Sequence, residues 1–192
     1  LVEGNAKTMR MVMFDEDEPV RSVQLYGVDP AVMGVAVRRL VDEIGVDHID
    51  MNFGCPAAKV TKKGGGGVLP VHRVLFGDIV GEAVRAAGSV PVTVKLRLGV
   101  DDEHRTYLDA GRIAEDQGAA AVALHARTVE QLYSGEAEWP AIGELKQAVT
   151  TVPVLGNGDI WEAADALRMV AETGCDGVVV GRGCLGRPWL FR

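Results

Sequence analysis

The chain has 192 residues, 47% of them hydrophobic, with 20 basic and 27 acidic side chains and a formal net charge of −7. This size and composition predict one globular domain with a sizeable core. The acidic balance excludes a protein that holds nucleic acid by bulk charge alone, so a polyanionic partner would have to meet a local basic patch.

Six short runs rich in β-branched residues recur along the chain after an opening segment, "LVEGNAKTMRMV", that is predicted to be loop and helix. Each run has the character of a buried parallel strand. In chain order they are "VRSVQLYG" from Val20, "HIDMNFG" from His48, "VPVTVKLRLG" from Val90, "AAVALHAR" from Ala120, "VPVLGNGDI" from Val152 and "DGVVVGRG" from Asp176. Between them lie stretches with helical spacing, which tend to end in glycine, where a left-handed C-cap costs little.

This alternation of strand and helix repeats with a period of roughly 30 residues, as in successive right-handed crossovers. A doubly wound sheet and a (β/α) barrel both fit the period. Polar and glycine residues gather at the carboxyl ends of nearly every run, which favours the barrel, because a barrel builds one shared active face there. We therefore predict an α/β fold, a TIM (β/α)8-type barrel that is incomplete, with about six of the eight strands that closure needs.

The interval between His48 and Val90 is longer than the others, and its surplus is the loop "GCPAAKVTKKGGGG" from Gly54 to Gly67. Long loops on a compact scaffold are usually functional. The four glycines would let the backbone approach a ligand closely, and neighbouring lysines, Lys59 among them, add positive charge. A flexible, solvated loop is the alternative interpretation.

Cys55 is the candidate general acid of this loop. It follows a strand end, Pro56 biases it towards an extended conformation, and Asn52 lies at the same mouth. A free thiol has a pKa of about 8.5 and is mostly protonated at neutral pH, so it can donate a proton without tuning. Cys175 and Cys184 flank the last apolar run and have the character of buried, inert cysteines.

The three cysteines also indicate the cellular compartment of the protein. They are odd in number, widely spaced and without a C-x-x-C arrangement, which favours neither a disulfide framework nor a metal site. The sequence has no apolar run near the roughly 20 residues that span a bilayer and no charged leader. We expect a cytoplasmic protein without membrane association, a monomer for which no protein partner is indicated.

The last two runs end in "LGNGDI" and "VGRGCLGRP", where barrels often build a phosphate site from backbone amides. Gly156, Gly158, Gly181 and Gly183 are the candidate exposed amides, and Arg182 is a charge partner. A single G-x-G is weak evidence, since such turns are common, but two at consecutive strand ends favour a phosphate ligand.

Lys95 lies within an apolar run, so a strand carries its ammonium to the barrel mouth. A buried lysine has to be paired or functional, and a cation near N1 of a flavin stabilises the reduced ring. A lysine that reaches solvent at a strand end is the alternative. His125 is placed similarly and is either a ligand contact or a core histidine, whereas His48 looks incidental.

Five motifs, in this order and spacing, resemble the tRNA-dihydrouridine synthases, and the bacterial DusB-like branch in particular. They are "DMNFGCPAAKVTKKGGGGVL", "PVTVKLRLG", "LHART", "LGNGDI" and "VGRGCLGRPWLFR". The resemblance covers essentially the whole chain. It implies an FMN-binding (β/α) barrel and the reduction of particular uridines of tRNA to 5,6-dihydrouridine with NADPH as electron donor.

Matched motif by motif, the resemblance makes Cys55 the proton donor to C5 of the uracil, while hydride passes from flavin N5 to C6. It places Asn52 close to the uracil. Lys59 in the charged loop, and Arg97 and Arg127 at the carboxyl ends of two runs, are further candidate substrate contacts. The resemblance implies contacts to FMN at Gln24 and Lys95 along the ring, and at His125, Asn157, Gly158, Asp159, Gly181 and Arg182 along the ribityl chain and phosphate.

Two parts of the family pattern are not in this sequence: an N-terminal "PMAG"-type strand that lines the flavin, and a C-terminal helical domain that helps to grip tRNA. We therefore expect residues 1–192 to form the FMN-binding barrel domain without those parts. Two alternatives remain open. One is a flavin barrel acting on a free pyrimidine, as dihydroorotate dehydrogenases do, and the other is a non-catalytic fragment.

Overall fold

The structure, a computed structural model, describes residues 1–191 and forms a single parallel sheet within them. The strand order is β1-β2-β3-β4-β5-β6, so each strand pairs with its neighbours in the sequence. The strands are β1 Ser22–Leu25, β2 His48–Phe53, β3 Val92–Arg97, β4 Ala121–His125, β5 Val154–Asn157 and β6 Gly177–Val179. A doubly wound sheet would reverse its order at a switch point, so this sequential order confirms the barrel prediction.

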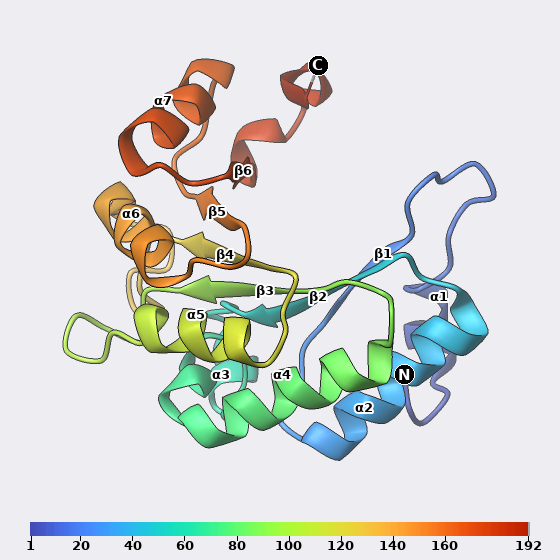
Figure 1. Ribbon diagram of the computed structural model, residues 1–192. Coiled ribbons are helices and arrows are strands. Elements are labelled where there is room, and N and C mark those ends of the chain that lie inside the picture. Colours follow the sequence, from blue (N-terminus) through green and yellow to red (C-terminus); the bar gives the residue numbers. More distant parts are fainter. Residues whose placement is uncertain (192) are drawn as a thin grey trace.

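The main helices lie along the convex side of the curved sheet and leave its other face concave (Figure 1). The α-helices are α1 Ala6–Arg10, α2 Pro30–Arg39, α3 Ala58–Thr61, α4 Arg73–Ala87, α5 Tyr107–Asp116, α6 Trp139–Ala148 and α7 Ala163–Thr173. A π-helical turn, η1 Leu40–Ile44, continues α2, and 3-10 turns occur at η2 Gly66–Val71, η3 Arg182–Cys184 and η4 Pro188–Phe191. None of the helices in the described part of the chain is both long and apolar enough to cross a bilayer.

The strands alternate between a buried and a concave face, as the period of two along a strand requires. In β2, Ile49, Met51 and Phe53 are buried against the helices, and in β3, Val92 and Leu96 are. Burying such a side chain contributes about 1.5–3 kcal/mol, so this layer between sheet and helices is the main source of stability. The residues that alternate with it on the concave face are polar in these two strands: His48, Asp50, Asn52, Thr93, Lys95 and Arg97.

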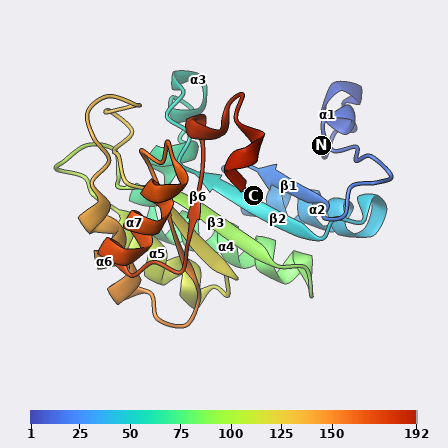
Figure 2. The same ribbon diagram turned by 90° about the horizontal axis from the view of Figure 1, so that it is seen from above.

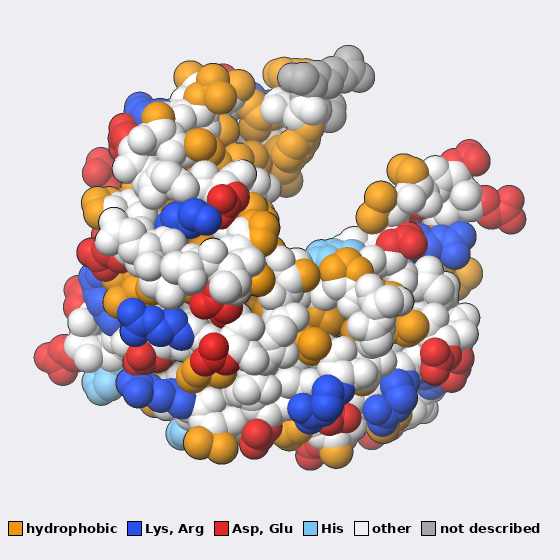
Figure 3. Space-filling view, viewed as in Figure 1, with side chains coloured by type: hydrophobic (Ala, Val, Ile, Leu, Met, Phe, Trp, Pro, Cys, Tyr) orange, Lys and Arg blue, Asp and Glu red, His pale blue; other side chains and the backbone are white. Residues whose placement is uncertain are grey.

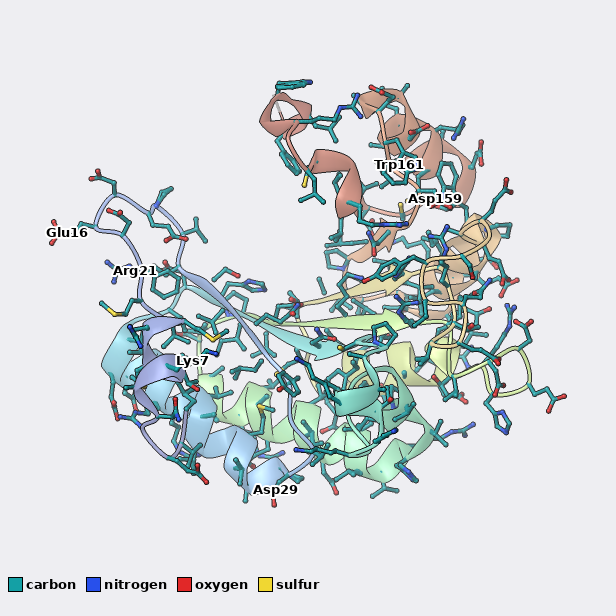
Figure 4. The ribbon with its side chains drawn as sticks, turned by 180° about the vertical axis from the view of Figure 1, so that it is seen from behind. Lys7, Glu16, Arg21, Asp29, Asp159 and Trp161 are labelled. Atoms are coloured by element: carbon teal, nitrogen blue, oxygen red, sulfur yellow. The ribbon has the colours of Figure 1, made fainter. Side chains whose placement is uncertain are left out.

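Within the described residues the sheet stays open, with β1 and β6 at its edges. The space-filling view shows two arms around a hollow that opens to one side (Figure 3). Asp159 and Trp161 belong to one arm, and Arg21 and Glu16 lie on the other (Figure 4). Seen from above, β2 runs towards the side on which α3 lies, so that side holds the carboxyl ends of the strands (Figure 2).

Candidate functional site

The carboxyl ends of the strands and the loops that follow them surround a cavity of about 360 Å³. All but two of the site residues predicted from the sequence line it: Gln24, Asn52, Cys55, Lys95, Arg97, His125, Arg127, Asn157, Gly158, Asp159, Gly181, Arg182 and Gly183. The exceptions are Lys59, which is exposed on α3, and Gly156, which is buried against Met169 rather than exposed as predicted. The structure therefore gathers at one place residues that are up to 159 positions apart, from Gln24 to Gly183 (183 − 24).

The turn that carries Cys55 is fixed from two sides. The side-chain oxygen of Asn52 accepts hydrogen bonds from the backbone N–H groups of Gly54 and Cys55, both at 3.0 Å. From the other side, the N–H of Gly67 donates to the carbonyl oxygen of Cys55 at 3.1 Å. Cys55 is half-buried and lines the cavity.

The glycine run has a different role from the one predicted. Gly66 and Gly67 are buried, and Gly66 has a φ of +63°. A Cβ at Gly66 would collide with the carbonyl oxygen of Cys55, and a Cβ at Gly67 would collide with Val129. The sequence predicts a loop that approaches a ligand, whereas the structure packs these glycines beneath Cys55, because only glycine leaves room for that backbone contact.

Lys95 projects from β3 towards β5, where its ammonium donates to Asn157 Oδ1 at 2.9 Å. The Asn157 amide in turn donates to the carbonyl oxygen of Val179 at 2.7 Å. Burial lowers the pKa of Lys95 to about 8, with a smaller lowering by the charge of Arg97 and an opposing rise from Asp50. At neutral pH Lys95 therefore remains largely a cation.

Arg97 is only 4% exposed and joins two loops through backbone carbonyl oxygens. Its Nε donates to Gly54 at 2.9 Å, and its Nη1 donates to Thr128 at 2.7 Å and to Leu132 at 2.8 Å. The guanidinium lies 5.5 Å from the ring centroid of Tyr133. Arg97 thus holds the turn before Cys55 against the loop after β4, and its contact with substrate stays a prediction.

Arg127 is 1% exposed and organises the other side of the cavity. Its Nη2 donates to both carboxylate oxygens of Asp159 at 2.7 Å and to the carbonyl oxygen of Gly135 at 2.7 Å, while Nε donates to that of Ser134 at 3.1 Å. Its Nη1 lies 3.3 Å from Nε2 of His125. Because a guanidinium can only donate, Nε2 of His125 is the acceptor and the ring proton sits on Nδ1.

His125 is a neutral hydrogen-bonding group rather than a charge. Burial, followed by the positive charges of Arg97, Lys95 and Arg127, lowers its pKa to about 3, against a weaker rise from Asp159. The ring therefore stays unprotonated at physiological pH. With Nε2 occupied by Arg127, its Nδ1–H is the group left to donate to a ligand.

Two aromatic residues that sequence reasoning missed complete the wall of the cavity. Tyr133 and Trp161 both line it, and the guanidinium of Arg182 lies 4.6 Å from the Tyr133 ring centroid and 5.4 Å from that of Trp161. Contacts of this kind hold an arginine over a ring face. The long interval between β4 and α6 was the signal in the sequence for Tyr133, because long loops at this face of a barrel tend to be functional.

The cavity is positively charged. Lys95, Arg97, Arg127 and Arg182 line it, and the one carboxylate among the described lining residues, Asp159, is paired with Arg127. Near the rim, a Cβ at Gly181 would meet nothing within 4 Å, so this stretch of backbone is open to a ligand. Arg182 and the open backbone beside it are suited to a phosphate or another anion.

A cysteine and a cluster of cations at the carboxyl ends of parallel strands form a candidate active site of the (β/α)-barrel class, and the cations suit it to an anionic ligand. The amino-acid sequence matches the dihydrouridine synthase (Dus) family over residues 1–192, and the chain belongs to that family. The resemblance drawn from the five motifs is therefore confirmed.

Relatives of known name agree with this. The chain is 65% identical over 193 residues to a probable tRNA-dihydrouridine synthase of Mycobacterium leprae, covering 100% of this chain and 50% of that protein. It is 44% identical over 184 residues to tRNA-dihydrouridine synthase B of Pseudomonas aeruginosa, covering 96% of this chain and 54% of that protein. The chain thus spans about half the length of the curated relatives it matches.

Solved structures of barrel enzymes share the fold. The crystal structure of TcOYE with pHBA superposes with a TM-score of 0.60 at 12% identity, covering 84% of this chain and 46% of that one. An enolase from Bradyrhizobium, complexed with magnesium and mandelic acid, gives a TM-score of 0.53 at 9% identity, covering 83% and 37%. At such identities the likeness concerns the fold alone, and it confirms the incomplete barrel.

Proposed function

We propose that this chain carries the uridine-reducing site of a tRNA-dihydrouridine synthase, which converts particular uridines of tRNA to 5,6-dihydrouridine with FMN and NADPH. The observation that carries the proposal is that the Cys55 thiol borders the same cavity that Lys95 and Arg182 make cationic. Membership of the dihydrouridine synthase family supports the substrate class.

The residues of the cavity fit FMN, whose phosphate is an anion. Arg182 and the open backbone at Gly181 would hold that phosphate. Lys95 supplies a cation beside Asn157, and His125 offers its Nδ1–H as a neutral donor. When bound, FMN would supply the hydride that C6 of the uracil receives, with NADPH as the source of electrons.

Cys55 holds the proton that C5 of the uracil needs. Its backbone is fixed by Asn52 and Gly67, and Arg97 holds the preceding carbonyl group of Gly54. These contacts fix the backbone that carries the thiol before substrate arrives, and a general acid has to be held in position to be effective. After the transfer, the thiolate regains its proton from solvent, so the residue is unchanged at the end of the cycle.

The tRNA has to present its uridine as an extruded base, because neither edge of a stacked base can reach a barrel cavity. The charge of −7 means that RNA contact is local. Lys59, Lys62 and Lys63 are exposed on and just after α3 and would meet phosphates near the mouth. Arg97 and Arg127 would act on the substrate mainly by holding the loops around it.

The first test is Cys55→Ala in the complete protein. We expect FMN binding and NADPH oxidation to persist, while dihydrouridine formation in tRNA falls by at least about 10²-fold, the usual contribution of a general acid. Cys175→Ala, which removes a thiol buried outside the cavity, is the matched control. Full product yield from Cys55→Ala would remove Cys55 from the reaction.

A second experiment separates this function from a flavin barrel that acts on a free pyrimidine. The protein with its flavin reduced under anaerobic conditions is mixed with unmodified tRNA or with a free pyrimidine, and flavin absorbance is followed. Rapid reoxidation by tRNA alone supports the proposal. Reoxidation by the free pyrimidine alone would assign the cavity to a small metabolite.

A further inference from the structure

A chain of hydrogen bonds leads from the turn of Cys55 back into the barrel and ends at Asp50. The Asn52 oxygen accepts the N–H groups of Gly54 and Cys55, and the Asn52 Nδ2 donates to Gln24 Oε1 at 2.9 Å. Gln24 Nε2 then donates to Asp50 Oδ2 at 2.6 Å. The chain thus links β1 and β2 across the concave face.

The direction of this chain is fixed by its two ends. Backbone N–H groups can only donate, and a carboxylate can only accept. The two side-chain amides between them, Asn52 and Gln24, therefore have a single consistent orientation. Turning either amide over would place an oxygen against an oxygen or an N–H against an N–H, with the loss of a hydrogen bond on each side.

A second chain reaches the other oxygen of Asp50 from β3. The Thr93 hydroxyl donates to Asp50 Oδ1 at 2.7 Å. Since its single proton is used there, Thr93 accepts from Nε2 of His48, 2.9 Å away. Nδ1 of His48 then accepts from the hydroxyl of Ser22 at 2.7 Å. His48, which looks incidental in the sequence, is thus a relay in a network whose two arms both end on one carboxylate.

We propose that Asp50 is a positioning residue for the candidate active site: as the common acceptor of both arms, it sets the orientation of Gln24 and Asn52 and thereby the turn that carries Cys55. The purpose of this arrangement rests on the proposed function, whereas the arrangement itself does not. Asp50 is absent from the residues that line the cavity, so it acts on a ligand only through its neighbours.

The same carboxylate also acts on Lys95. The negative charge of Asp50 opposes the loss of the lysine proton that burial favours. Asp50 therefore supports the turn of Cys55 through hydrogen bonds and also favours the charged form of Lys95. An asparagine at position 50 has one oxygen, so it could accept from only one of Gln24 and Thr93, and it would remove the negative charge.

The test exchanges the side chains at positions 50 and 52, which reverses the direction of the two hydrogen bonds made by the Gln24 amide. In Asn52→Asp, the new carboxylate cannot donate to Gln24, so an acceptor faces an acceptor whichever way the Gln24 amide turns. In the double variant Asp50→Asn with Asn52→Asp, the amide introduced at position 50 can donate to Gln24 Oε1, Gln24 Nε2 can donate to the carboxylate introduced at position 52, and the backbone N–H groups keep their acceptor. The exchange conserves charge and the number of hydrogen bonds.

The variants are compared with the wild type by three measurements on the complete protein without substrate. They are the denaturant midpoint, hydrogen exchange in peptides covering residues 52–57, and the alkylation rate of Cys55 followed by mass spectrometry. We expect Asn52→Asp to lower the midpoint and to speed amide exchange at the turn about tenfold, equivalent to about one lost hydrogen bond. The double variant should return all three towards the wild type.

The control replaces a carboxylate elsewhere. Asp102 is 80% exposed in its ion pair with Arg105, and Asp102→Asn should leave the defect of Asn52→Asp uncorrected. The proposal would be overturned if Asp50→Asn and Asp102→Asn both corrected the defect of Asn52→Asp, or if neither did. Failure of the double variant Asp50→Asn with Asn52→Asp to fold would also overturn it. Since no readout uses catalysis, loss of the proposed function would leave this result standing, and loss of this result would leave the test of Cys55 standing.

Discussion

Two glycine-rich regions lie near the candidate site, and the glycines nearest to Cys55 differ in their surroundings from the glycine that precedes Arg182. Below Cys55, Gly66 and Gly67 are buried, and a Cβ at either position would strike a neighbour. Beyond β6, Gly181 is exposed, and a Cβ there would meet nothing within 4 Å. Gly66 brings two backbones together, whereas Gly181 leaves its backbone open. Gly183, two residues further on, is buried against the carbonyl oxygen of Ile160.

This difference matches the two tasks that we propose for the cavity. A proton donor has to be held still, so the turn of Cys55 is packed from beneath and bonded from both sides. An anion has to reach backbone N–H groups, and at Gly181 nothing lies within 4 Å of the position that a Cβ would take. Glycine content alone, therefore, does not tell a support from a ligand site.

The largest effect is expected from Gly66→Ala. Alanine would have to adopt a φ of +63° and place its Cβ against the carbonyl oxygen of Cys55. The strain and the displaced backbone should lower the free energy of unfolding by about 2–4 kcal/mol. Chemical denaturation measures this, and a loss below about 0.5 kcal/mol would show that the glycine run is not packed as described.

Lys95, which lies between the two regions, should make stability depend on pH. Its folded pKa of about 8 is below its ordinary value of 10.5, so above pH 8 the unfolded state binds more protons than the folded state. The free energy of unfolding should therefore rise between pH 8 and pH 10.5, by about 3 kcal/mol for this group. Lys95→Met should remove that rise, and parallel pH profiles for the two proteins would contradict it.

Arg182→Gln tests the open region. We expect FMN affinity to fall by about 10- to 100-fold, the equivalent of a charged hydrogen bond of about 1.5–3 kcal/mol, with little change in stability because the side chain is exposed. Titration of flavin fluorescence measures the affinity. An unchanged affinity would move the phosphate to another part of the cavity.

The smallest effect on stability is expected from Gly181→Ala, because space is open around it. We expect the free energy of unfolding to change by less than about 1 kcal/mol. FMN binding should weaken if the phosphate lies against this backbone. Denaturation and flavin titration on the same sample separate the two effects, and a loss as large as that of Gly66→Ala would erase the contrast between the regions.

The strands were predictable because their signal is local. The runs "HIDMNFG" and "VPVTVKLRLG" contain β2 and β3 almost to the residue, since alternating burial is written in each run itself. The cavity residues were predictable for a related reason, as the carboxyl ends of parallel strands meet at one edge. The motifs of the family then indicated which of the residues at these strand ends belong to the site.

What the sequence does not reveal are the partners of the buried polar groups. Arg97 donates to the carbonyl oxygens of Gly54, Thr128 and Leu132. Because every residue has a backbone carbonyl group, the sequence does not indicate which of them accept. Asp50 accepts from Thr93, which is 43 positions away. Contacts of this kind depend on register between strands, which only the assembled sheet fixes.

The strand order of the sheet also bears on how the chain could assemble during synthesis. Each strand pairs with the one made just before it, through a crossover that closes a short stretch of chain. Local closures cost less entropy than distant ones. A nascent chain could therefore extend the sheet one strand at a time as it leaves the ribosome, with the cavity completed only when the segment after β6 emerges.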